Sequence, residues 1–317
     1  MISTILVPLD GSALSEAALP YAQALASRTS ARLTLVRAAH VRKSLSDGTD
    51  QIRAIGEAAD YLTHLCDQLT AQGFHVDVGV PFGGSTAGWI LEEIDLRHAD
   101  LVVMATHDRS GPQRWIHGSV AEVVVSHASV PVLVVRAADG LGGAARLTRS
   151  DQVLVVPLDG SKLAEAAVPV ATDLATQLGA RVVLLGVVPR PGDRAAAQGS
   201  VITSDEYERL TGEAERYLVA VANSQRTGEL QLATCVKTGH AAEEIARLAT
   251  ELAATCIVMS THGRTGIARA MLGSVAGETT HRSPCAVMLV RPPQQADAEA
   301  GVAVTSSEAR ARGGAGS

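Results

Sequence analysis

Aromatic residues are scarce in this 317-residue chain: they make up 3% of it, whereas hydrophobic residues make up 46%. A core so poor in aromatics must be built from Val, Leu, Ile and Ala, as in parallel strands covered by Ala-rich helices. Long apolar runs are also lacking, since nowhere do 18 apolar residues run together and the stretch 2–9 is broken at once by Asp10, Gly11 and Ser12. The sequence therefore predicts a cytoplasmic protein with no membrane span and no secretory leader.

Several chemical signatures are missing as well. The four cysteines form no CxxC pair, which argues against a zinc or thioredoxin-like site. We expect Cys66, Cys235, Cys256 and Cys285 to be buried and to pack as small hydrophobic side chains. The formal net charge is −6 and no basic run appears, so nucleic acid is not an expected partner. The histidines lack metal-ligand spacing, which predicts no metal site. The pattern GxxxxGK[ST] is absent, which excludes a P-loop NTPase.

The chain contains an internal duplication. The run VPLDGS near Asp10 recurs near Asp159, and the run THDRSGPQRWIHGS recurs as THGRTGIARAMLGS. The offset between the copies is 149 residues at Asp10 and 155 at Gly118, so one domain is repeated with a small middle insertion. We expect half one at 1–137 and half two at 151–292, each long enough to bury its own core.

Each half alternates short β-branched runs with longer Ala/Leu/Glu segments, which is typical of a parallel sheet. We predict strands at 2–8, 32–38, 75–80, 101–106 and 132–136, and again at 153–157, 181–188, 231–237, 256–261 and 286–291. Helices are expected to begin near Ser12, Asp50, Ser85, Gly118, Ser161, Ser204, Ala241 and Gly273, with N-caps at Ser12, Ser85 and Ser161. This is a doubly wound α/β fold whose ligand crevice lies at the carboxyl ends of the strands.

Two segments lie outside the strand and helix pattern. The Gly-rich stretch 138–150 is predicted to link the two halves. The stretch 293–317 has little to bury and is predicted to be a disordered tail.

The two motifs of each half follow central strands and should face each other across the crevice. In half two, Gly263 and Gly273 would let backbone amides approach a polyphosphate, and Gly273-Ser274 would open a helix whose positive end faces the charge. Asp159 is an acceptor suited to ribose hydroxyls or to a metal carried by the phosphates. Asp10 and Asp159 could instead only cap the helices that follow them.

These motifs resemble those of the universal stress protein family, here as a tandem pair up to Pro292. The resemblance implies a five-stranded parallel sheet of order 3-2-1-4-5 in each half, and ATP as ligand, with Mg²⁺ as a companion ion. In that family the nucleotide motif is Gly, two residues, Gly, nine residues, Gly, then Ser or Thr. Transferred to half two, the resemblance implies a site made of Pro157, Asp159, Val187, Ser260, Gly263, Arg264, Gly266, Gly273, Ser274 and Val275. Ser260 replaces the first glycine of the motif.

Half one departs further from the family motif. It presents Ala105 and Asp108 where the first two glycines are expected, and the Asp108 carboxylate would repel a phosphate. We therefore expect half one to bind ATP more weakly or not at all. Its remaining candidates by the same resemblance are Asp10, Ala38, Gly118 and Ser119, with Ala38 and Val187 at the adenine position.

Other polar residues are given structural roles. His107 and His262 lack a nucleophile or acidic partner and are expected to order their loops. Arg109 and Arg264 could approach phosphate, but Arg264 is equally compatible with a solvated loop residue. The pairs Glu92-Glu93 and Glu243-Glu244 are expected on a solvated helix face.

The sequence thus predicts an ATP-binding regulatory stress-response protein with no catalytic residues, whose regulatory partner is not identified. Two alternatives stay open: a slow ATPase or adenylate-forming relative that uses Asp159, and a ligand-free scaffold. The two halves are expected to pack through edge strands as an internal pseudo-dimer, and the chain to form a homo-oligomer.

Overall fold

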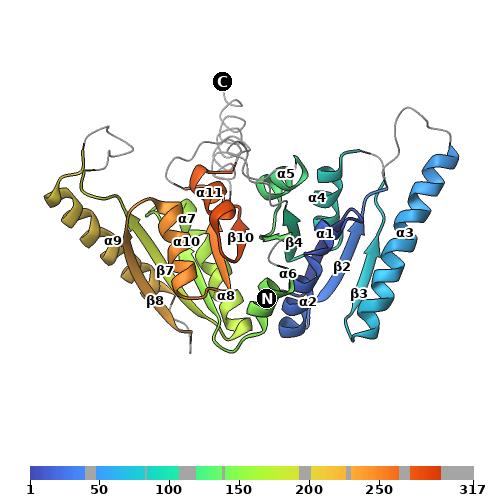
Figure 1. The fold of residues 1–317 in the computed structure, drawn as a ribbon, viewed down its shortest axis with the longest axis horizontal. Coiled ribbons are helices and arrows are strands. Elements are labelled where there is room, and N and C mark those ends of the chain that lie inside the picture. Colours follow the sequence, from blue (N-terminus) through green and yellow to red (C-terminus); the bar gives the residue numbers. More distant parts are fainter. Residues whose placement is uncertain are drawn as a thin grey trace, which may run out of the picture.

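A computed structural model describes residues 1–39, 48–82, 84–106, 119–137, 140–192, 201–225, 230–263 and 272–293. Ten strands lie in these ranges (Figure 1), each within two residues of its predicted bounds: β1 (Thr4–Leu9), β2 (Arg32–Arg37), β3 (Val76–Gly79), β4 (Leu101–Thr106), β5 (Val132–Arg136), β6 (Val153–Pro157), β7 (Arg181–Val188), β8 (Leu232–Thr238), β9 (Cys256–Ser260) and β10 (Ala286–Val290). The predicted tail lies outside the described residues from 294 onward.

The strands are connected mainly by helices. Those of half one are α1 (Ala13–Glu16), α2 (Leu19–Thr29), α3 (Gly48–Ala71), α4 (Thr86–Leu96) and α5 (Ser119–His127). Those of half two are α7 (Lys162–Glu165), α8 (Ala167–Leu178), α9 (Ser204–Ser224), α10 (Ala241–Glu251) and α11 (Ser274–Arg282). The segment predicted as a linker contains α6 (Gly140–Ala144) and a 3₁₀ helix, η2 (Ala145–Thr148), and its Leu147 is buried.

The serine caps are confirmed, but the first helix of each half is broken in two. The side chains of Ser12, Ser85 and Ser161 each accept a hydrogen bond from a backbone N–H of the helix that follows. The helix α1 ends at Glu16, four residues before Pro20, and α7 ends at Glu165, four residues before Pro169. A proline lacks the N–H for the carbonyl four residues back and its ring clashes with that carbonyl, which explains both breaks.

The predicted strand order is confirmed in each half, and the two sheets are continuous. The full order is β3-β2-β1-β4-β5-β10-β9-β6-β7-β8, so each half has the order 3-2-1-4-5. All neighbouring strands within a half are parallel, whereas β5 and β10 pair antiparallel at the centre, with Val134 opposite Val287. The two halves therefore join through edge strands, as expected of an internal pseudo-dimer.

Helices cover both faces of this ten-stranded sheet. One apolar layer packs α2, α3, α8 and α9 against one face, together with Leu147 of η2. The other layer packs α4, α5, α10 and α11 against the opposite face. Figure 1 shows α5 and α11 above the central strands and α6 and α8 below them. Both layers contain residues of both halves, so the core runs without interruption across the junction.

Two polar contacts across the junction are nearly symmetric. Arg136 Nη1, at the end of β5, donates to the His281 carbonyl at 3.4 Å, and Arg291 Nη1, just beyond β10, donates to the His127 carbonyl at 3.1 Å. Each arginine thus reaches the last turn of the helix that covers the other half's edge strand. Within the described part of the chain, no helix is long and apolar enough to cross a membrane.

Candidate functional site

The Asp-Gly-Ser turn after the first strand has the same geometry in both halves. In half two, Asp159 Oδ1 accepts hydrogen bonds from the Ser161 N–H at 2.9 Å and the Ser161 hydroxyl at 2.6 Å. Asp10 and Ser12 of half one make the same two bonds at the same distances. The glycine between them has a φ of 85° in both turns, a left-handed conformation that favours glycine. Each turn therefore fixes an exposed carboxylate at the mouth of the crevice while its serine caps the next helix.

Gly263 lies directly against the carboxylate of Asp159. A Cβ atom on Gly263 would collide with Asp159 Oδ2, so a larger residue there would force this carboxylate or the loop after β9 to shift. The structure thus brings the two motifs of half two into contact across the crevice.

Gly273 places the N-terminus of α11 against the end of β9. Its N–H donates to the Thr261 carbonyl at 2.9 Å, and a Cβ on Gly273 would lie 3.0 Å from the same oxygen. Gly273 is the N-cap of α11 and provides no side-chain cap. The first turn of α11 therefore has no side-chain cap from Gly273, and its Ser274 and Val275 are exposed.

The residues around β9 hold this loop in place. Ser260 and Thr261 are buried; Ser260 Oγ accepts from the His262 N–H at 3.3 Å, and Thr261 Oγ1 lies 3.0 Å from His262 Nδ1. These contacts agree with a loop-ordering role for His262. Pro157 is buried at the end of β6, and Val187 is half-buried near the end of β7, two strands from β9. Arg264 and Gly266 lie outside the described residues and stay predictions.

Only part of the weaker site of half one is described. Gly118 and the loop with His107, Asp108 and Arg109 lie outside the described residues, as does the side chain of Ser119. Asp10 is exposed; partial burial raises the pKa of its carboxyl, but hydrogen bonds from Ser12 and Ser15 outweigh this and hold the pKa below its ordinary value. Ala38 is half-buried just beyond β2.

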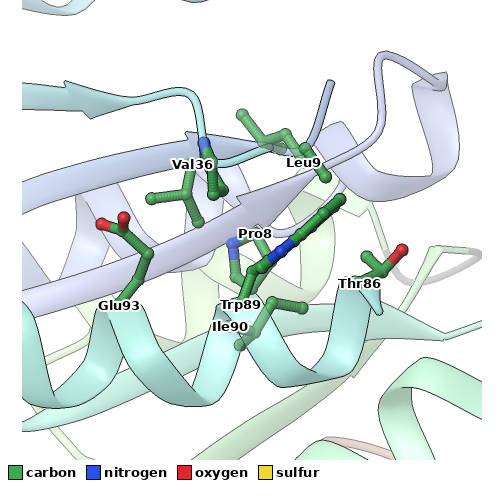
Figure 2. A pocket seen from close by; sticks show the side chains of 9 residues that line it. Pro8, Leu9, Val36, Thr86, Trp89, Ile90 and Glu93 are labelled. Atoms are coloured by element: carbon green, nitrogen blue, oxygen red, sulfur yellow. The ribbon is translucent and has the colours of Figure 1, made fainter. Parts of the chain in front are cut away.

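Two side chains of half one that the sequence analysis overlooked lie at its crevice. Arg37 places its guanidinium 4.5 Å from the centre of the Tyr61 ring and against Gly11, where a Cβ would lie 2.9 Å from Arg37 Cζ. Trp89 lines a cavity of about 20 Å³ together with Pro8 and Ala38. In Figure 2 its indole extends from α4 between Pro8 and Thr86 toward Leu9. Comparing the halves position by position would have singled out both residues, because half two has Gly186 and Glu244 in their places.

Two other sequence-based expectations need correction. Glu93 and Glu244 were expected on a solvated face, but both are buried against the sheet, and Arg97 and Arg247 on the next helical turn pair with their carboxylates. Of the four free cysteines, Cys256 and Cys285 are buried as expected, whereas Cys66 and Cys235 are only half-buried. Burial raises the pKa of the Cys256 thiol, as for a structural cysteine. Among the residues that the structure describes, no three His, Cys, Asp or Glu side chains form a metal-binding group.

Fold and crevice together define a duplicated, doubly wound α/β protein with its loops of interest at the carboxyl ends of the strands. The sequence pattern described as the universal stress protein family matches residues 1–136 and 152–291. The chain belongs to the universal stress protein family.

Several curated relatives and solved structures are similar to this chain. A universal stress protein of Mycolicibacterium smegmatis is 28% identical over 303 residues, which are 91% of this chain and 97% of that protein. Universal stress protein MJ0531 of Methanocaldococcus jannaschii is 31% identical over 145 residues, 45% of this chain and 83% of its own length. The crystal structure of a universal stress protein from Archaeoglobus fulgidus superposes with a TM-score of 0.68 at 19% identity, covering 92% of this chain and 97% of the other. This last likeness supports the fold alone.

Proposed function

We propose that this chain is an ATP-binding regulatory protein of the stress response, with the nucleotide held mainly by half two. The observation that carries the proposal is the contact between the two motifs of half two. A Cβ on Gly263 would collide with the Asp159 carboxylate, and a Cβ on Gly273 would lie tightly against the Thr261 carbonyl. Two glycines pressed against polar groups at the carboxyl ends of neighbouring strands form a cradle in which backbone N–H groups can meet phosphate oxygens.

Within this cradle the residues have distinct tasks. The uncapped first turn of α11 offers N–H donors and the positive end of the helix dipole to the phosphates, and the Ser274 hydroxyl is a further donor. Asp159 holds ribose hydroxyls or a Mg²⁺ ion bound to the phosphates. Val187, at the end of β7, contacts the base. Sequence and topology support these roles.

The proposal assigns binding rather than turnover. The Thr261 hydroxyl lies 3.0 Å from His262 Nδ1, but Thr261 is buried, so we assign this contact to ordering the loop rather than to activating a nucleophile. Bound nucleotide would stabilise one arrangement of the crevice and so change the surface that a regulatory partner meets in the cytoplasm. The same proposal includes association of chains into a homo-oligomer.

Binding should depend on Gly273 far more than on Gly118. Gly273→Asp puts a carboxylate beside the Thr261 carbonyl at the phosphate position, so we expect ATP affinity to fall at least a hundredfold, about 2.7 kcal/mol. Gly118→Asp, the matched change in half one, should alter ATP affinity less than threefold. Titration calorimetry measures both, and thermal unfolding without ligand shows that each variant folds. Equal losses from the two variants would contradict the assignment to half two.

A further inference from the structure

The surroundings of Arg37 are repeated in half two, but the arginine is not. Tyr61 donates to Glu16 Oε1 at 2.8 Å, and its counterpart Tyr217 donates to Glu165 Oε1 at 3.3 Å. The Asp-Gly-Ser turn is also the same in both halves. At the position of Arg37, however, the alignment of LTLVRA with VVLLGV places Gly186. One residue therefore decides whether a guanidinium lies over this turn.

In half two the positive charge near this turn belongs to a different residue, Lys162. Glu165 pairs with Lys162 at 2.6 Å, and the Lys162 side chain is 91% exposed on α7. The equivalent position in half one is Ala13, which carries no charge. Half two thus carries its cation on Lys162, paired with Glu165, whereas half one carries its cation on Arg37, against Gly11.

Trp89 and Glu244 form a second pair of equivalent positions at which half one has the larger side chain. Trp89 on α4 packs against Gly84, where a Cβ would lie 3.1 Å from Trp89 Nε1. Glu244 on α10 packs in the same way against Gly239, where a Cβ would lie 3.0 Å from Glu244 Oε1. The bulky indole and the smaller carboxylate therefore occupy equivalent places, and the carboxylate is engaged with Arg247.

Little room remains beside the indole. The cavity that Trp89 lines with Pro8, Leu9 and Ala38 measures about 20 Å³, which is room for about one water molecule. In Figure 2 the indole of Trp89 lies between Pro8 and Leu9 at the end of β1 and Thr86 at the start of α4. The indole thus lies where a planar base would have to enter next to Ala38.

We propose that Arg37 and Trp89 are the specificity-determining residues that close half one to nucleotide, and that Gly186 and Glu244 leave half two open. The Trp89 indole takes the space of the base, and the Arg37 guanidinium covers the turn that presents Asp10. The side chains of half one thus occupy its own crevice. As a consequence, the chain binds one nucleotide. This inference rests on the function proposed above and explains the asymmetry with residues outside the glycine motif.

The first test exchanges these residues between the halves, with AMP as the probe because it depends least on the loop after β4. Arg37→Gly with Trp89→Glu should raise the stoichiometry in native mass spectrometry from one AMP to two. Gly186→Arg with Glu244→Trp should weaken AMP binding at least tenfold; the nearest neighbour of a Cβ at position 186 is the flexible Leu218 side chain, at 3.3 Å. Gly56→Arg, where a Cβ meets nothing within 4 Å, adds the same charge elsewhere and should leave binding unchanged.

The outcomes separate the two proposals. If the wild-type chain binds neither AMP nor ATP, the proposed function fails. If the wild type binds AMP but the exchanged variants keep its stoichiometry and affinity, the function stands and the role of Arg37 and Trp89 is overturned.

A second measurement keeps both Arg37 and Trp89. The chain has two tryptophans, so Trp115→Phe makes Trp89 the only indole fluorophore. Its emission should stay constant through an AMP titration that saturates half two, because no base reaches half one. Saturable quenching or a spectral shift of Trp89 would show that nucleotide enters half one, and would overturn the inference.

Discussion

At the scale of single residues, Gly263 shows how the absence of a side chain shapes the crevice. Its neighbour across the crevice is the Asp159 carboxylate, which a Cβ would strike. We expect Gly263→Ala to lower the free energy of unfolding by about 1–3 kcal/mol, the usual cost of overpacking, and to weaken ATP binding. Chemical denaturation and calorimetry measure these effects.

The matched control is Gly56→Ala on α3, where a Cβ meets nothing within 4 Å. Because alanine favours a helix by about 1 kcal/mol over glycine, this control should be neutral or stabilising. Wild-type stability and affinity in Gly263→Ala would show that the loop moves freely away from Asp159.

The Asp10 carboxylate makes the free energy of unfolding depend on pH. Because the pKa of its carboxyl is lower in the folded chain than its usual unfolded value of about 3.9, its charge stabilises the fold. This contribution is present above the unfolded pKa and is lost as the pH falls through the folded pKa. Asp10→Asn should therefore reduce the free energy of unfolding at pH 7 and do so less at pH 3. Urea unfolding at both pH values measures the difference; a larger reduction at pH 3 would contradict it.

For single residues, the conformation of a turn could be predicted from the sequence, whereas the burial of a side chain could not. Asp-Gly-Ser predicts both the left-handed glycine and the serine cap because these depend on neighbouring residues alone. The burial of Glu93 depends on the sheet beneath α4, and the position of Arg37 on Tyr61 from another helix. Such contacts between distant segments leave no local pattern.

At the scale of the elements, the caps set where helices begin. Ser85 Oγ accepts from the Gly88 N–H at 3.1 Å and starts α4, the helix that carries Trp89 and Glu93. Ser85→Ala should lower the free energy of unfolding by about 1 kcal/mol, and Ser85→Asp, which retains an acceptor, by less. Thermal and urea unfolding compare the two variants, and an equal loss in both would exclude capping as the cause.

Element bounds were predictable because apolar periodicity and turn residues mark them directly. The breaks at Pro20 and Pro169 were missed although both prolines are visible in the sequence. A proline is common in the first turn of a helix, so Pro20 by itself does not indicate a break. The break becomes visible only in the structure, where a separate four-residue helix ends just before the helix that contains the proline.

At the scale of the whole molecule, the junction of β5 and β10 makes two homologous halves into one body. Val134 faces Val287 across this junction and both are almost fully buried. Because the two apolar layers cross the junction, we expect the wild-type chain to unfold in one cooperative transition. Val134→Lys buries an unpaired charge there and should produce two separate transitions in calorimetry.

The control for this variant is Val123→Lys on α5, where the valine is 37% exposed. It should keep the single transition. Two transitions in the wild-type chain would mean that the halves unfold independently. Sequence alone predicted edge-strand packing but not the antiparallel register, which depends on side chains from strands more than 150 residues apart.

That antiparallel pairing also determines which way the molecule faces. Near the junction the strands of half one point in the direction opposite to those of half two, so their carboxyl ends lie on opposite rims of the common sheet. A partner that docks beside the Asp159 turn approaches from one rim, and the Asp10 turn remains accessible from the other. Under the proposed function, a nucleotide beside the Asp159 turn and a partner beside the Asp10 turn would therefore lie on opposite edges of the sheet and would not compete for the same surface.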